Sequence, residues 1–212
     1  MTYNPMGLIR ESKPWTILKR LLGARNVIDE YIAAGKIPWS SGYSKYKNQY
    51  LSRIFTNTDL MACFKANRQL PSEFGFKLDE RVVEYPWVMS HLSLGAGRIM
   101  DAGSCMNVPI ILNLSQLKSR TLIIHSLNID CMYVMPGVSY MIGDFRDSIF
   151  SDQTFATIVC ISTLEHVGMW PIPTDQKMKP KTQTQIPCDL KAYREVLSVF
   201  RRLLMPGGQL LL

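Results

Sequence analysis

Side chains able to do chemistry gather in four short turns, each at or just after the end of an apolar run. The runs are residues 98–103, 121–127, 138–142 and 155–162. In an open parallel sheet, ligands bind beyond the carboxyl ends of the strands where the strand order reverses, so these turns are the candidates for a site. The turns contain carboxylates and hydroxyls that can hydrogen-bond to a nucleoside and small residues that leave room for it. One of them also contains an imidazole, which can act as an acid or a base.

The first turn is Asp101-Ala102-Gly103-Ser104, followed by residues 105–107 with the sequence Cys-Met-Asn. Gly103 permits a tight turn and a close approach of the backbone to a ligand. The small side chains of Ala102 and Ser104 leave room around it. Taken alone, this pattern is equally typical of a simple turn.

The second turn follows residues 122–125. An acid at this place commonly accepts hydrogen bonds from the ribose hydroxyls of a nucleoside. Ser126 stands there instead, and Asp130 comes four residues later. Either the Ser126 hydroxyl bonds the ribose or Asp130 reaches back; we favour Ser126.

The third turn places Asp144 directly after a run and Phe145 next to it. The carboxylate could accept a hydrogen bond from an adenine amino group, while Phe145 offers an apolar surface to the ring. The alternative is that Asp144 caps the next helix or turn. We favour the ligand role, because residues 149–155 lead straight into the fourth run.

The fourth run reaches Ile161 and leads to Leu-Glu-His-Val at residues 164–167. With this motif, residues 98–212 resemble the class I S-adenosylmethionine (SAM)-dependent methyltransferase family, and look most like its type 11 members. The motifs that carry the resemblance are IMDAGS at 99–104, GD at 143–144, LEHV at 164–167, and YRE with LMPGG at 193–208.

The resemblance implies that residues 101–104 lie against the methionine part of SAM and that Ser126 meets the ribose. It also implies that Asp144 and Phe145 hold the adenine, and that the segment from Ile161 to Glu165 faces the sulfonium. The family's turn normally carries further glycines where this chain has Cys-Met-Asn at 105–107.

Glu165 and His166 are the candidate catalytic residues. Methyl transfer from a sulfonium depends mainly on aligning the acceptor and removing water. A base helps when the acceptor is protonated, and an imidazole with a pKa of about 6.5 could serve. The alternatives are that His166 only shapes the loop and that Glu165 forms a cofactor-side wall or begins a helix.

The runs alternate with helical segments, most clearly residues 189–204. This pattern predicts an α/β, doubly wound, mainly parallel Rossmann-like sheet with helices on both faces. We expect a mostly helical N-terminal extension over residues 1–80, with helices at 15–34 and 57–67 and a loop at 38–50, and a methyltransferase domain over 81–212. The resemblance implies two strands beyond residues 209–212, so we expect a domain lacking its C-terminal strands, that is, a fragment.

The composition and the charge distribution indicate which kinds of site, compartment and partner to expect. Five cysteines lack paired spacing and three histidines lack helical spacing to one another, so we expect reduced thiols, a cytoplasmic protein and no metal site. No signal peptide or transmembrane segment is evident.

Residues 1–80 carry 12 Lys and Arg against 7 Asp and Glu, and residues 81–212 carry 12 against 10. We interpret the excess as a solvated surface; nucleic acid, a phosphorylated glycan or a membrane surface are the alternatives.

The sequence therefore predicts a SAM-dependent methyltransferase. A small molecule or glycan is favoured as acceptor over nucleic acid, because no stripe of aromatic and basic residues is evident. The rivals are a noncatalytic methyltransferase-like binding module, which the residues at 105–107 favour, and a nicotinamide-dependent oxidoreductase, which the absence of GxGxxG disfavours. The oligomeric state does not follow from the sequence.

Overall fold

The computed structural model describes residues 26–93, 95, 97–118, 120–168, 189 and 191–212. The chain divides into two compact units, residues 1–50 and 51–212. No helix in the described ranges is long and apolar enough to cross a membrane.

The first unit contains α2 (Val27–Ala33) and the start of α3 (Tyr43–Thr56). The part of the predicted 15–34 helix that precedes residue 26 falls outside the described residues. The predicted loop at 38–50 is wrong from Tyr43 onward. Tyrosines 43, 46 and 50 recur at helical spacing, and Tyr43 and Tyr46 pack against Tyr31 of α2 at ring distances of 6.2 and 5.3 Å. The start of α3 therefore buries an aromatic face, although its sequence has no aliphatic residues at helical spacing.

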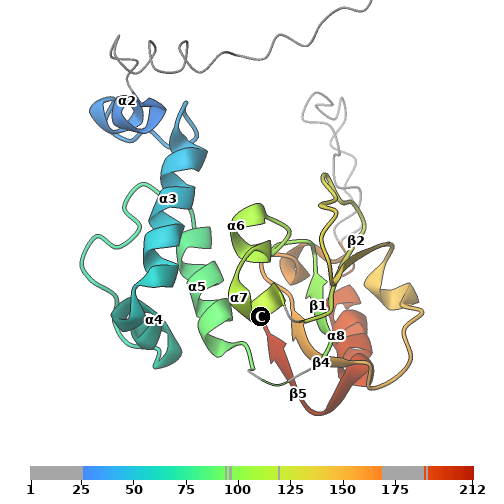
Figure 1. The fold of residues 1–212 in the computed structure, drawn as a ribbon. Coiled ribbons are helices and arrows are strands. Elements are labelled where there is room, and N and C mark those ends of the chain that lie inside the picture. The colour runs from blue at the N-terminus through green and yellow to red at the C-terminus, as the bar shows by residue number, and fades with distance from the viewer. Residues whose placement is uncertain (1–25, 94, 96, 119, 169–188, 190) are drawn as a thin grey trace, which may run out of the picture. The chain divides into compact units, whose positions relative to one another are not determined.

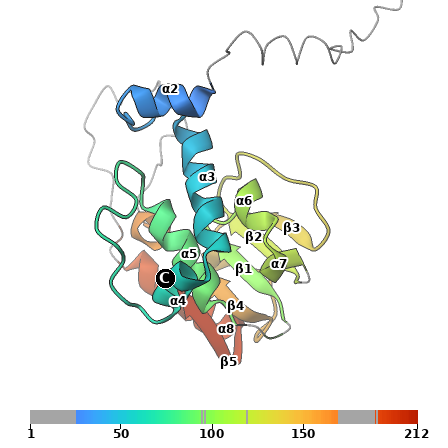
Figure 2. The ribbon, with the colours of Figure 1, turned by 60° about the vertical axis from the view of Figure 1, so that its left-hand side comes forward.

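The second unit holds a five-stranded parallel sheet in the order β3-β2-β1-β4-β5, which can be followed from label to label in Figure 2. The strands are β1 (Ile99–Ala102), β2 (Leu122–Ser126), β3 (Val138–Ile142), β4 (Phe155–Val159) and β5 (Leu204–Leu211). The predicted α/β class and parallel sheet are confirmed. β5 begins earlier than residues 209–212, because Leu204 already pairs with Phe155 ahead of a bulge.

Helices cover both faces of the sheet, as the doubly wound pattern predicts (Figure 1). The helices and short 3-10 turns are α4 (Thr58–Lys65), α5 (Arg81–His91), α6 (Pro109–Leu112), α7 (Ser115–Lys118), η1 (Phe145–Asp147), η2 (Leu164–His166) and α8 (Ala192–Leu203). Helix α4 lies within the predicted 57–67 helix, and α8 within 189–204.

The main core lies between the sheet and α8. Val196, Phe200 and Leu203 of α8 are buried with Met100 of β1 and Ile158 of β4. Side chains alternate across a strand, so Ile99 and Asp101 point to the other face of β1. That alternation turns Asp101 away from the α8 core.

Candidate active site

The strand order reverses beside β1, which pairs with β2 on one side and β4 on the other. At the carboxyl end of this pair the two following turns touch. Gly103 has a φ of +112°, and a Cβ there would lie 1.9 Å from Oγ1 of Thr163. The Thr163 hydroxyl also stabilises the turn after β4, because it donates to the carbonyl of Ile161 at 2.9 Å. The structure thus joins the first and fourth predicted turns at the point where such sheets bind ligands.

Both turns contain a non-glycine residue in the left-handed region. Ser104 has a φ of +66° and Ser162 a φ of +46°. Such conformations cost about 1–3 kcal/mol each and persist where the surroundings enforce them, often at functional sites. Their occurrence on both of the touching turns supports a functional role for this edge of the sheet.

Asp101 is fully buried at the end of β1. Its Oδ2 accepts a hydrogen bond from the backbone N–H of Met106 at 2.9 Å, whereas Oδ1 has no partner among the described residues. Burial raises the pKa of Asp101 to about 7, against the opposing effects of backbone hydrogen bonds from Met106 and Cys105 and of the Arg81 charge. A positively charged group bound near this turn would favour the ionised carboxylate.

Helix α5 contributes polar residues that the sequence analysis missed. The Arg81 guanidinium pairs with Glu84 and donates to Oγ of Ser162 at 3.0 Å, and Ser162 donates to Glu84 at 3.0 Å. The hydroxyl of Tyr85 donates to the carbonyl of Cys105 at 2.9 Å. Residues 81, 84 and 85 share one helical face, so this spacing was the available signal.

The thiols near the turns after β1 and β4 do not supply a nucleophile. Burial, with a further contribution from the Asp101 charge, raises the pKa of both Cys105 and Cys160 to about 12. Both stay protonated at neutral pH, and the thiolate is the reactive form. Covalent cysteine chemistry is therefore not what this edge supports.

Ser126 ends β2, and its carbonyl accepts from Gly143 N–H at 3.0 Å, which places the second and third turns side by side. Asp130 is exposed and accepts from Asn128 at 3.2 Å. The structure therefore places Ser126, rather than Asp130, at the strand end.

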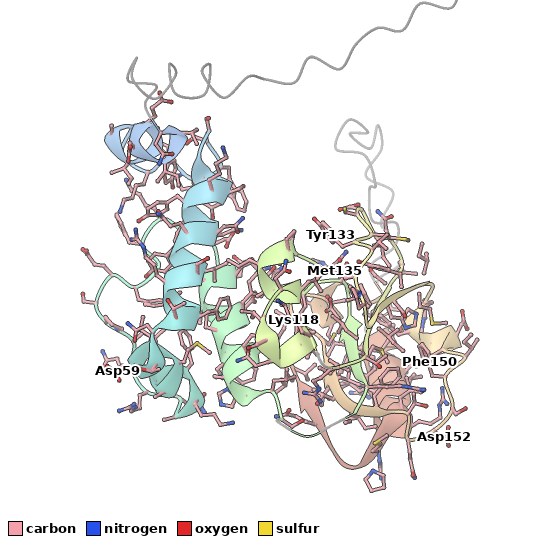
Figure 3. All side chains as sticks on the ribbon, in the orientation of Figure 1. Asp59, Lys118, Tyr133, Met135, Phe150 and Asp152 are labelled. Carbon is pink, nitrogen blue, oxygen red and sulfur yellow. The ribbon has the colours of Figure 1, made fainter. Side chains whose placement is uncertain are left out.

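The segment between β2 and β3 is tied to the first turn. Asn107 donates to the carbonyl of Cys131 at 2.7 Å, and the Tyr140 hydroxyl donates to Oδ1 of Asn107 at 3.2 Å and accepts from Tyr133 N–H at 2.7 Å. Figure 3 shows Tyr133 at this edge of the sheet and Asp152 at the opposite one. Asn107 therefore anchors a covering loop, a role that a glycine at this position could not perform.

Asp144 caps η1, as the alternative interpretation expected. Its carboxylate accepts from the backbone N–H of Arg146 at 2.9 Å and pairs with the Arg146 guanidinium at 2.7 Å. The hydrogen bond from the Arg146 side chain is the largest effect lowering the pKa of Asp144.

Phe145 differs from expectation because its ring belongs to the core. It is 7% exposed, with the ring of His125 at 5.0 Å and that of Phe200 at 5.7 Å. The expected open apolar face for an adenine ring is not present at Phe145, since the α8 core takes up that side chain.

The residues after β4 fall into two groups. Ile161 is buried, whereas Glu165 and His166 of η2 are both exposed. The structure places these two side chains where solvent or an acceptor can reach them. No three His, Cys, Asp or Glu side chains gather as metal ligands in the part of the chain that is described.

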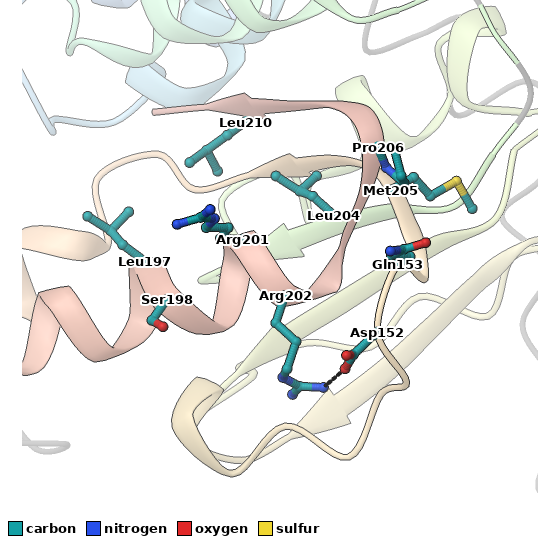
Figure 4. A pocket seen from close by; sticks show the side chains of 10 residues that line it. All are labelled: Asp152, Gln153, Leu197, Ser198, Arg201, Arg202, Leu204, Met205, Pro206 and Leu210. Atoms are coloured by element: carbon teal, nitrogen blue, oxygen red, sulfur yellow. Dashed lines mark hydrogen bonds and ion pairs between the residues drawn. The ribbon is translucent and has the colours of Figure 1, made fainter.

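A pocket of about 800 Å³ opens at the other end of the sheet, between the last turn of α8 and the first residues of β5 (Figure 4). Arg202 lines it and pairs with Asp152 at 2.9 Å while donating to the carbonyl of Phe150 at 2.9 Å. None of the predicted site residues lines this pocket. Arg202 therefore holds the segment before β4.

No family model matches the chain, and no curated protein matches it either. Among solved structures, the selenomethionine-substituted carbon methyltransferase CurJ is similar, with 14% sequence identity and a TM-score of 0.41. The match covers 95% of this chain and 51% of that one, so the chain spans about half the length of the solved structure. A likeness at this level assigns no function.

Proposed function

We propose that the chain binds SAM at the carboxyl edge of β1 and β4 and transfers its methyl group to a small-molecule or glycan acceptor. The observation that carries the proposal is the contact between the Gly103 turn and Thr163 beside the buried Asp101. It brings two motifs of the methyltransferase resemblance together at the switch point of the sheet.

The residues fit the cofactor in part. An ionised Asp101 with an unpartnered oxygen suits the positive charges of SAM, and Ser126 and Asp144 end neighbouring strands, as ribose and adenine contacts require. Phe145 does not fit the predicted role, because its ring is packed in the core. Adenine binding in this proposal therefore rests on Asp144 rather than on ring stacking.

When bound, SAM supplies an activated methyl group on a neutral leaving group. The task of the chain is then to orient the acceptor and exclude water. In the proposal, Ile161 and the Gly103 turn wall the cofactor side, while the exposed His166 removes a proton from a hydroxyl acceptor. Glu165 lies next to it on the same turn.

Titration calorimetry of the full chain with SAM, and separately with the nicotinamide cofactor NAD, tests the proposal. Saturable binding of SAM and none of NAD is the expected result. Binding of NAD alone would support an oxidoreductase, and binding of neither would support a noncatalytic module.

A further inference from the structure

One face of helix α5 contacts both of the segments that flank the proposed cofactor site. The Tyr85 hydroxyl donates to the carbonyl of Cys105, at 2.9 Å, in the segment after β1. The Arg81 guanidinium donates to Oγ of Ser162, at 3.0 Å, in the turn after β4. A single helical face therefore holds the chain on both sides of the point where the strand order reverses.

Arg81, Glu84 and Ser162 form a closed ring of polar contacts. The Arg81 guanidinium pairs with the Glu84 carboxylate and donates to Ser162, and the Ser162 hydroxyl donates to Oε1 of Glu84 at 3.0 Å. The side chains of Arg81 and Glu84 are only 23% and 25% exposed, so the pair is largely withdrawn from solvent. Hydrogen bonds to charged groups are stronger than those between neutral groups, and here they fix the direction of the serine hydroxyl.

The ring engages a serine whose backbone has an unusual conformation. Ser162 has a φ of +46°, in the left-handed region where the Cβ of an L-residue is crowded against the backbone. A non-glycine residue keeps such a conformation only when its surroundings enforce it. Both hydrogen bonds of the Ser162 hydroxyl go to α5, so this helix supplies the contacts that hold the side chain.

We propose that Arg81 and Glu84 are positioning residues, which hold the turn after β4 in the conformation that the cofactor site requires. The inference rests on the proposed function, because this turn contacts the turn after β1 and leads to the candidate base His166. The pair acts through Ser162 and needs no contact of its own with SAM or the acceptor. Its opposite charges cancel, so it orients the turn without adding a net charge to this edge of the sheet.

Arg81→Met keeps most of the aliphatic length of the side chain but removes both of its polar contacts. The strained backbone at Ser162 should then relax, and we expect the turn to keep its present conformation only about a tenth of the time. SAM affinity of the full chain, measured by titration calorimetry, should fall on the order of tenfold, because only that fraction is competent to bind. Hydrogen exchange across residues 161–167, measured without SAM, should become at least about tenfold faster.

The matched control is Arg202→Met. Arg202 also pairs with a carboxylate, that of Asp152, but at the opposite end of the sheet. The same chemical change there should leave both SAM affinity and the exchange of residues 161–167 unaltered.

A glycine at residue 162 separates this role from simple packing of α5. Glycine adopts a positive φ without strain, so adding Ser162→Gly to Arg81→Met should recover SAM affinity several-fold. Ser162→Ala leaves the Arg81–Glu84 pair in place but keeps the strain, so it should show the same losses as Arg81→Met. With circular dichroism as the check on folding, Ser162→Ala also tests the proposal if Arg81→Met does not fold.

Unaltered exchange in Arg81→Met and Ser162→Ala, or no recovery with glycine, would overturn this inference and leave the proposed methyl transfer standing. So would faster exchange with unaltered SAM affinity. A wild-type chain that does not bind SAM would overturn the proposed function and this inference with it.

Discussion

Gly103 and Thr163 lie so close that any side chain at residue 103 would overlap the threonine, with 1.9 Å between the added Cβ and Oγ1. The two residues follow β1 and β4, neighbours in the sheet but distant in the sequence. This approach fixes how the two turns lie against each other. Glycine is therefore required at residue 103 for two reasons, the positive φ and the close packing against Thr163.

We expect Gly103→Ala to lower the free energy of unfolding by about 2–4 kcal/mol, because it adds an overlap to a backbone strain. Gly207→Ala is the matched control, since Gly207 also has a positive φ, of +74°, but no atom within 4 Å of its added Cβ. It should cost about 1 kcal/mol from strain alone. Urea denaturation of both variants measures the difference, and equal losses would show that the contact with Thr163 is unimportant.

The raised pKa of Asp101 predicts a pH dependence of stability. The folded-state pKa is about 7, above the usual value of 3.8 for an aspartic acid, so the unfolded chain loses this proton first as the pH rises. The contribution of Asp101 to the free energy of unfolding should therefore fall from about pH 4 to pH 7 and level off above, by at most about 4 kcal/mol. Asp101→Asn keeps an acceptor for Met106 and should flatten this part of the profile.

Denaturant titrations at a series of pH values check this prediction. Asp130→Asn makes the same chemical change at an exposed side chain and serves as the control. A profile for Asp101→Asn that matches the wild type between pH 4 and 7 would mean that Asp101 is not desolvated as the structure indicates.

His125 predicts a loss of stability in mild acid. It is fully buried between aromatic rings, and neither ring nitrogen makes a hydrogen bond of normal geometry among the described residues. Burial lowers the pKa of His125, against the opposing effects of Asp144 and the Gly143 backbone. The unfolded chain therefore takes up the proton more readily, and the contribution of His125 to stability should fall as the pH drops below about 6.5.

His125→Leu should remove the part of this loss that His125 causes, and thermal melts at pH 7.5 and 5.5, on the order of one pH unit either side of the histidine pKa, compare it with the wild type. The exposed His166 provides the control variant, His166→Leu, which should keep the acid loss. If His125→Leu is as acid-sensitive as the wild type, another group is responsible.

Asp144 and Asp152 offer a matched pair for locating the cofactor. Each carboxylate pairs with an arginine, Asp144 with Arg146 at the carboxyl edge and Asp152 with Arg202 beside the pocket at the opposite end. Asp144→Ala should weaken SAM binding by about 1–3 kcal/mol through the loss of its proposed hydrogen bond to the adenine. Asp152→Ala should leave SAM affinity unchanged. Calorimetry that gave the reverse result would move the site to the pocket.

His166→Ala should lower turnover far more than SAM affinity, because in the proposal the imidazole acts on the acceptor. Transfer of label from methyl-labelled SAM to a small-molecule and glycan extract measures turnover, and calorimetry measures affinity. A fully active variant would return His166 to a role in shaping the loop.

Local pattern was enough to predict the sheet. Buried parallel strands read as continuous apolar runs, so β1 to β4 and the amphipathic α8 were visible in the sequence, as were the turns after them. The tyrosine-rich start of α3 was not, because its helical face is aromatic and completed by Tyr31 of another helix. The tyrosines of α3 do recur at helical spacing, but the ring that Tyr43 and Tyr46 pack against belongs to α2, so the spacing within α3 does not show that this face is covered.

The sequence by itself determined the α/β class, the alternation of strands and helices, and a set of polar turns at strand ends. Only the tertiary structure decided which turns meet, because strand order depends on long-range packing: β4 lies beside β1 and brings Thr163 onto Gly103. It also decided that Phe145 packs in the core and that Arg81 and Glu84 reach Ser162. These are contacts between residues far apart in the chain, and the local preferences of a residue do not specify its distant partners.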